Sequence, residues 1–304
     1  MSVSSEVAAP QARSLDAGPI TVIVLMCMCW GLNMVAIKFS LPDFPPLVQV
    51  AIRISGGFFI VLAWCWYRGI KLLERDGTLI PGLITGVLFG LEFAVIFPAM
   101  QFTTATRASL FIYTAPFFVA LGARWFLPNE KLVPLQWFGL ILCFLGLAAA
   151  IGIPQPGVDA QVLLGDIMVI AGGAAWGATT LVMKASKLVT VAPEKTLMYQ
   201  LVVAIPILFA LSAALGEHIT HTPGPVAVWW LVFQILVVGL TFPVWFTLIQ
   251  RFSATRVSAF TVLTPLFGVA AGCLLLNEPF TLAFAIAVVL VAGGLVLVNR
   301  RPRA

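Results

Sequence analysis

The stretch ATRASLFIYTAP, residues 105–116, returns as ATRVSAFTVLTP, residues 254–265. Each copy leads through an apolar run to the pair Asn-Glu, at residues 129–130 and at residues 277–278. The two arginines are 149 residues apart, the two prolines are also 149 apart, and the two glutamates are 148 apart. Self-similarity at a fixed offset is the mark of a repeated architecture, so the stretch predicts two halves of about 150 residues.

A second echo lies upstream of the first. Trp30-Gly31 with Lys38 returns, 146 residues later, as Trp176-Gly177 with Lys184. Because both echoes have nearly the same offset, the repeat is expected to cover the whole chain rather than one segment of it.

The composition places most of the chain in lipid. Of the 304 residues, 61% are hydrophobic and only 10% are charged, and the mean hydropathy is +1.06. Soluble domains are close to half apolar and about a quarter charged. The net charge of +5 forms no basic patch with interleaved aromatic residues, so nucleic acid is not an expected partner. The five cysteines are scattered through apolar runs without a C-x-x-C pair, so we expect no metal site, disulfide framework or cofactor.

Ten apolar runs are long enough to cross a bilayer, which takes roughly 20 residues per helix. They lie at residues 20–40, 46–67, 79–101, 105–125, 133–152, 162–184, 195–214, 226–250, 255–276 and 280–299. The sequence thus predicts an all-α membrane protein of ten transmembrane helices, five in each half. The expected divisions are a disordered cytoplasmic leader at 1–18, repeats at 19–152 and 162–299, and a basic cytoplasmic tail at 300–304.

Lysines and arginines set the expected orientation. With the N-terminus inside, 14 of the 17 basic residues fall on the inner side, Lys38 and Arg107 fall on the outer side, and Arg53 lies within a span. The positive-inside rule then places both termini in the cytoplasm. Since five spans per half is an odd number, the second half enters the membrane in the opposite sense. Two inverted repeats that meet at the midplane are the usual construction of secondary transporters.

The order of these features resembles a known family. Two five-helix halves, Trp-Gly early in the first span of each, the Ala-Thr-Arg-x-Ser start of the fourth and the Glu after it are similar to EamA-type members of the drug/metabolite transporter superfamily. This resemblance covers residues 20–300. In length and general pattern the chain looks most like the YddG-like exporters of aromatic and other neutral amino acids. The resemblance implies ten helices around a central cavity with the fifth and tenth peripheral, a small-molecule substrate, and a place in the bacterial inner membrane. The sequence does not set the oligomeric state, and a monomer is compatible with it.

Glu92 is the clearest functional candidate, because it lies near the middle of the third span, where an ionisable group is expensive. Gly82, Gly86 and Gly90 form a ridge on the same helix, of the kind that lets two helices pack closely. At 100° per residue, Glu92 points about 200° away from Gly90. The ridge is therefore predicted to face a neighbouring helix and the carboxylate to face a watery cavity. The alternative is a structural carboxylate that pairs with Arg53.

Arg53 lies in the second span at a depth similar to that of Glu92, about 10 Å against about 13 Å from the outer end at 1.5 Å per residue. It could pair with Glu92 and hold two helices together. It could equally bind the carboxylate of a substrate through two parallel hydrogen bonds. Both roles stay open on the sequence alone.

Aromatic and small polar residues that share helix faces complete the predicted substrate site. They are Trp30 and Asn33 in the first span, Trp176, Thr179 and Thr180 in the sixth, and Tyr113 in the fourth. Residues three apart share a helix face, so each tryptophan has a polar neighbour beside it. An aromatic wall beside amide and hydroxyl groups suits a neutral, amphipathic solute. The alternative is that the aromatic rings only pack helices together.

Four basic residues at span ends are expected to be structural or gating. Arg107 and Arg256 begin spans, where they would fix helix ends or close a gate by pairing with glutamate or with carbonyl groups. Lys38 and Lys184 form the corresponding pair in the first span of each half. The Asn-Glu pair of each copy is expected to cap or connect helices.

The leading hypothesis is a secondary transporter that exports neutral or aromatic amino acids by alternating access. A multidrug or quaternary-ammonium exporter is the alternative, because a deep carboxylate among aromatic rings also holds an organic cation. An intramembrane lipid-modifying enzyme is less favoured, since the chain lacks a convergent set of nucleophiles, metal ligands or paired acids. We therefore predict a transporter and not an enzyme.

Overall fold

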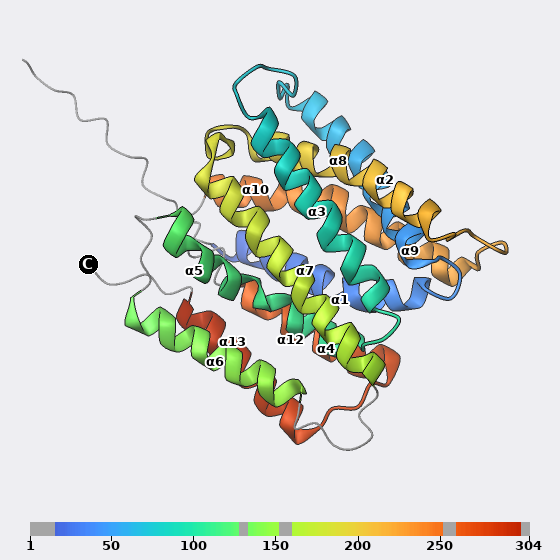
Figure 1. Ribbon diagram of the computed structural model, residues 1–304, viewed down its shortest axis with the longest axis vertical. Helices are drawn as coiled ribbons and strands as arrows, with labels where there is room; N and C mark the ends of the chain where they lie inside the picture. The colour runs from blue at the N-terminus through green and yellow to red at the C-terminus, as the bar shows by residue number, and fades with distance from the viewer. Residues whose placement is uncertain (1–15, 128–132, 152–159, 252–259, 299–304) are drawn as a thin grey trace, which may run out of the picture.

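The computed structural model describes residues 16–127, 133–151, 160–251 and 260–298, and every regular element within these ranges is a helix (Figure 1). The helices are α1 (Ala17–Ser40), α2 (Pro46–Tyr67), α3 (Leu79–Ala99), α4 (Ala105–Phe111), α5 (Ala115–Phe126), α6 (Pro134–Ile151), α7 (Ala160–Ala185), α8 (Pro193–Ala214), α9 (Pro225–Leu236), α10 (Phe242–Arg251), α12 (Leu263–Leu276) and α13 (Leu282–Val298). Most of the predicted leader and the whole predicted tail lie outside the described residues.

The protein is an all-α membrane protein. Seven of the described helical stretches are long and apolar enough to cross a bilayer, and three further apolar helices are shorter. Large apolar side chains also cover the outer faces, such as Phe59 at 66% exposure, Ile80 at 71% and Val289 at 70%. Since lipid offers the backbone no hydrogen bonds, helices that satisfy their own amides and carbonyls are the expected solution for such a chain.

Within the described residues, two of the predicted spans contain a non-α turn between two α-helices, which hydropathy did not predict. A short 3₁₀ turn, Ile112–Thr114, separates α4 from α5 directly ahead of Pro116. A π-helical turn, Val237–Thr241, separates α9 from α10 directly ahead of Pro243. Proline lacks an amide hydrogen and its ring collides with the carbonyl group four residues earlier, so the preceding turn must adjust.

Helices α2 and α8 begin and end in the same way. Each starts with proline, Pro46 or Pro193, whose fixed φ suits the first helical position. Each is followed by a glycine of positive φ, Gly69 at 66° and Gly216 at 68°. In both, the residue after that glycine donates its amide hydrogen back to the carbonyl five residues earlier, as in a Schellman motif.

The loop after each of α2 and α8 bonds to the start of the other helix. Glu217, in the loop after α8, accepts hydrogen bonds from the backbone amides of Leu47 (2.8 Å) and Val48 (3.1 Å) at the start of α2. Asp76, in the loop after α2, pairs with Lys195 (2.7 Å) at the start of α8. The last turn of each helix therefore lies near the first turn of the other, and the two helices run antiparallel.

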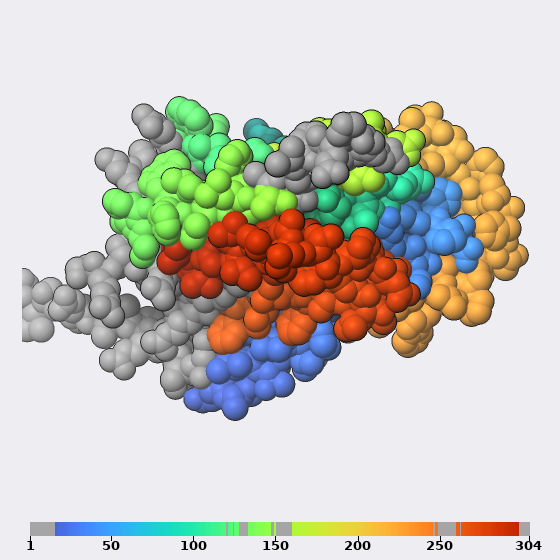
Figure 2. All heavy atoms as spheres, turned by 90° about the horizontal axis from the view of Figure 1, so that it is seen from below, coloured from blue at the N-terminus to red at the C-terminus, as the bar shows by residue number. Residues whose placement is uncertain are grey.

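Helices α6 and α13 lie side by side at one edge of the bundle, and α2 and α8 lie toward the opposite edge (Figures 1 and 2). Gly146 of α6 and Gly294 of α13 each face the other helix so closely that an added Cβ would meet its backbone. Small residues allow such close approach of helices in a membrane.

The glycine ridge on α3 packs as predicted. Gly82 and Gly86 lie against Tyr199 and Val203 of α8, and Gly90 lies against Ala204 of the same helix. Any side chain at Gly82 or Gly86 would collide with α8, so the ridge commits this face of α3 to packing. Glu92 lies on a different face.

Candidate functional site

Glu92 and Arg53 are buried inside the bundle, on α3 and α2. Glu92 retains 7% of its exposure and Arg53 retains 4%. The guanidinium carbon of Arg53 lies over the rings of Phe93 (4.8 Å from the ring centre) and Phe97 (5.4 Å). Such cation–π contacts stabilise a cation in an apolar place, but they satisfy none of its N–H donors.

The ion pair that the sequence left open between these two residues is not formed. No hydrogen bond or salt bridge joins these two described side chains. Glu92 Oε2, Arg53 Nε and Arg53 Nη1 are buried without a hydrogen-bond partner among the described residues. Buried charges are normally paired, so a separated pair of opposite sign can receive a ligand that carries both complementary charges.

A glutamine pair next to Arg53 was missed by the sequence analysis. Gln49, one helical turn before Arg53, donates to the side-chain oxygen of Gln234 on α9 (3.3 Å) and to the carbonyl oxygen of Ile37 on α1 (3.3 Å). Gln234 in turn donates to Ser40 Oγ (3.2 Å). Both glutamines are fully buried. The network ties α1, α2 and α9 together and fixes the face of α2 that carries Arg53.

Trp30 packs against the second half of the chain. Its ring lies edge-on to Trp245 (5.2 Å between centres), and its Nε1 donates to Thr241 Oγ1 (2.8 Å) in the π-helical turn. The indole donor is therefore already satisfied. Asn33, on the same helix and 7% exposed, keeps its Oδ1 buried without a partner among the described residues.

Tyr113 and Trp176 are brought together by α7 and the 3₁₀ turn, with their rings edge-to-face at 6.0 Å. Trp176 remains 37% exposed. Thr179 and Thr180 bind their own helix instead, since each donates its hydroxyl hydrogen to the carbonyl group four residues earlier (both 3.0 Å). Among the described residues, this aromatic pair and the rings around Trp30 form two separate groups of ring contacts.

Arg107 pairs with an aspartate, a partner that the sequence did not predict. Its guanidinium makes a bidentate contact with Asp166 of α7, with Nε at 3.1 Å and 3.0 Å from the two carboxylate oxygens and Nη2 also bonded to Oδ2. Thr103 Oγ1 donates to the same carboxylate (2.6 Å), which is fully buried. The cluster fastens the start of α4 to α7.

Glu278 caps a helix of the other half. Its two oxygens accept hydrogen bonds from the backbone amides of Ala105 and Thr106, both at 2.7 Å. A carboxylate at the first turn is favoured by the helix dipole, and the expected capping role of this glutamate is confirmed. Lys38 and Lys184 lie in the last turns of α1 and α7, where a cation is favoured for the same reason. Arg256 and residues 129–130 lie outside the described residues.

The loops before α2 and α9 make a separate polar cluster. Asp43 accepts from the backbone amide of Gly224 (2.7 Å) and contacts His221 Nε2 (3.0 Å). These contacts hold the pKa of Asp43 below its usual value, chiefly through the bond to His221. The cluster joins the loop after α1 to the loop before α9. A hollow of about 290 Å³ beside it contains none of the predicted site residues.

Residues 18–152 and residues 163–300 each match the model of the EamA-like transporter family. This chain belongs to that family. A similar protein of Bacillus subtilis, named uncharacterized transporter YoaV, is 26% identical over 278 residues, which cover 90% of this chain and 94% of that protein. EamA-like relatives named probable amino-acid metabolite efflux pump occur in Salmonella typhimurium, at 30% identity, and in Escherichia coli, at 28%; each match covers 89% of this chain and 91% of the relative.

A solved crystal structure shares this fold. It superposes with a TM-score of 0.66 at 21% sequence identity and covers 91% of this chain and 96% of its own. The helical arrangement described above is thus the arrangement of a known protein. The EamA-like protein is a membrane transporter, and its substrate is a small molecule.

Proposed function

We propose that this transporter exports neutral amino acids, with the solute bound between Glu92 and Arg53. The observation that carries the proposal is the pair of buried, opposite and separated charges on α3 and α2. A zwitterionic solute offers a carboxylate to Arg53 and an ammonium group to Glu92, and thereby neutralises both. The rings of Phe93 and Phe97, which contact the Arg53 guanidinium, add apolar surface to this proposed site. The names of the Salmonella and Escherichia relatives favour the same solute class.

The further members of the proposed substrate site are Trp30, Asn33, Tyr113 and Trp176. Asn33 supports this assignment most, because its buried carbonyl oxygen lacks a partner among the described residues. Thr179 and Thr180 support it least, since their hydroxyl groups already bind the α7 backbone.

We further propose ten transmembrane helices in two inverted five-helix repeats around a central cavity. The two family matches have nearly equal length, and the seven long and three shorter apolar helices fit ten spans. The contacts that join the end of α2 to the start of α8, and the end of α8 to the start of α2, favour inverted repeats in particular. A two-fold axis in the membrane plane makes equivalent helices antiparallel, whereas an axis along the membrane normal would make them parallel.

The solute is tested in proteoliposomes with labelled neutral, acidic and basic amino acids and a quaternary ammonium compound. We expect saturable flux of neutral amino acids and no chemical change in them. Analogues that lack either the carboxylate or the ammonium group are expected to move at least about tenfold more slowly, because each leaves one buried charge without a partner. Flux of the quaternary ammonium compound that needs Glu92 but not Arg53 would instead favour the drug-exporter alternative.

The proposed topology places both termini and the loops after α2 and α7 in the cytoplasm. In a variant that lacks the five native cysteines, a cysteine at Val189 is expected to react only from the cytoplasmic side and a cysteine at Thr220 only from the outer side. Both positions are exposed, so the reagent can reach either one from its own compartment. Reaction of both from the same side would contradict the proposed topology, in which α8 crosses the membrane between them.

A further inference from the structure

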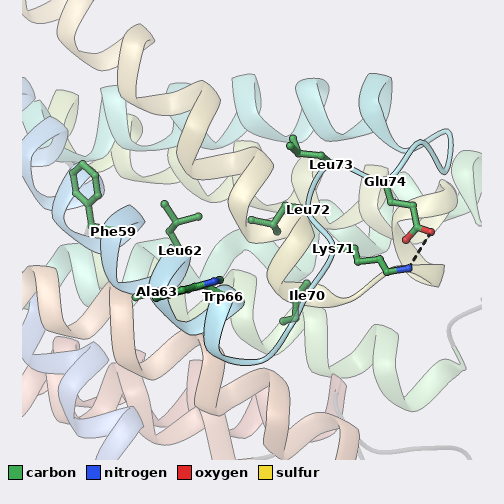
Figure 3. Close-up of a pocket in the computed structure, with 9 residues that line it drawn as sticks. All are labelled: Phe59, Leu62, Ala63, Trp66, Ile70, Lys71, Leu72, Leu73 and Glu74. Atoms are coloured by element: carbon green, nitrogen blue, oxygen red, sulfur yellow. Dashed lines mark ion pairs between the residues drawn. The ribbon is translucent and has the colours of Figure 1, made fainter.

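A groove runs along the last turns of α2 and the loop that follows them. After Gly69 the chain turns back, and its side chains enclose a hollow of about 820 Å³ together with those of α2. The lining residues are Phe59, Leu62, Ala63, Trp66, Ile70, Lys71, Leu72, Leu73 and Glu74. Figure 3 shows Phe59 at one end of this groove and the contact between Lys71 and Glu74 at the other.

The walls of the groove are apolar and open to the surroundings. Trp66 is 87% exposed, Leu73 is 97% exposed and Phe59 is 66% exposed. Large apolar side chains gathered in this way mark a place where lipid or a partner covers the protein. Trp66 and Tyr67 end the span, which is where aromatic residues lie at the interface between membrane and water.

The segment that carries the groove has a basic surplus, since residues 68–75 include three basic side chains and one acidic one. Lys71 and Glu74 line the groove, and Arg68 and Arg75 are their neighbours in the sequence. Glu74 holds Lys71 only loosely, since their atoms are 3.9 Å apart and the side chains are 58% and 78% exposed. Exposed pairs of this kind contribute little, so a stronger anion can displace the glutamate.

Asp76, the second acidic residue of this loop, already has a basic partner. Asp76 pairs with Lys195 and accepts from Thr78, and these contacts lower the pKa of Asp76 to about 2. The carboxylate is therefore charged at physiological pH and is already paired with Lys195. Lys187 lies against Gly77 and adds another positive charge on the same side. The loop thus presents a basic surplus beside an apolar groove.

We propose that this groove binds an anionic phospholipid of the leaflet that the loop faces, which is the cytoplasmic leaflet in the topology given above. One acyl chain lies along Phe59, Leu62 and Trp66, and the phosphate group contacts Lys71. The site goes beyond solute transport. Basic groups beside transmembrane helices on the cytoplasmic side attract anionic headgroups. The exposed apolar wall of the groove supplies the contact for the acyl chain.

The test measures lipid bound to the purified full-length protein by native mass spectrometry, with phosphatidylglycerol and phosphatidylcholine as probes. We expect the anionic lipid to bind more tightly than the zwitterionic one. Lys71→Gln is expected to weaken phosphatidylglycerol binding about fivefold, because one basic residue near a membrane surface contributes about that factor. Glu74→Gln is expected to strengthen it, since the competing carboxylate is removed. Both residues are exposed, so neither change threatens folding.

Leu73→Asn makes one wall polar and is expected to weaken the binding of both lipids. Trp229→Ala serves as its control, because Trp229 is also exposed (68%) but lies on α9, away from the groove. Equal affinity for the two lipids, or no response to Lys71→Gln and Glu74→Gln, would overturn the proposal. Loss of a dimer on Leu73→Asn, without any change in bound lipid, would also overturn it and assign the groove to a second copy of the chain.

Discussion

Glu92→Gln is expected to give a well-folded protein whose amino-acid flux falls roughly ten- to a hundredfold below that of the wild type. A hydrogen bond to a charged group contributes about 1.5–3 kcal/mol, and each 1.4 kcal/mol is a factor of ten. Glutamine keeps the size and reach of the side chain but cannot neutralise an ammonium group. The fold should tolerate the change, because Glu92 makes no ion pair among the described residues and the glycine ridge of α3 packs on another face.

Three companion variants separate transport from folding. Glu194→Gln is the matched control, since Glu194 is another buried carboxylate (4% exposed) but lies in the first turn of α8. It is expected to keep wild-type flux. If Glu92 were structural, Glu92→Gln and Glu92→Ala would both lower the folded yield, and adding Arg53→Met to Glu92→Gln would restore it. Wild-type flux between pH 5 and 8 in well-inserted Glu92→Gln would refute the proposed role.

The apolar runs of the sequence were enough to predict where the described helices lie. Spans were predicted at residues 46–67 and 195–214, and α2 and α8 begin at Pro46 and Pro193. The turns ahead of Pro116 and Pro243 were not predicted, because both prolines lie inside apolar runs of sufficient length. A hydropathy pattern reports which solvent surrounds a segment, and it does not report whether the helix inside that segment is continuous.

The site was predictable where one helix alone decides the geometry. The opposite faces of Gly90 and Glu92 follow from helical periodicity on α3, and the packing of that ridge on α8 agrees with it. The partner of Arg107 was not predictable, since Asp166 is on another helix in the other half of the chain. The same limit applies to Gln49 and Gln234, whose contact depends on how α2 meets α9. A usable signal was nevertheless present, because Asp166 and both glutamines are polar residues inside apolar runs.

Asp166→Asn is expected to destabilise the protein more than any other single change considered above. Removing one partner of a buried ion pair costs about 3–5 kcal/mol, because the remaining charge is left in an apolar place. Asp166 is fully buried, while the Arg107 side chain keeps 21% of its exposure, so we expect the lower end, about 3 kcal/mol. At about 2 °C per kcal/mol for a chain of this size, the melting temperature should fall by roughly 6 °C.

Two comparisons make this prediction specific to the buried pair. Glu74→Gln breaks the exposed contact with Lys71 and should leave the melting temperature within about 2 °C of the wild type, since such pairs contribute about 0–1 kcal/mol. The double variant Asp166→Leu with Arg107→Met removes both charges and should recover most of the loss. If the pair also closes a gate, the single variant will in addition let a thiol reagent reach a cysteine introduced in the first turn of α4 more readily. Lower stability without that change in access means that the pair only anchors α4 to α7.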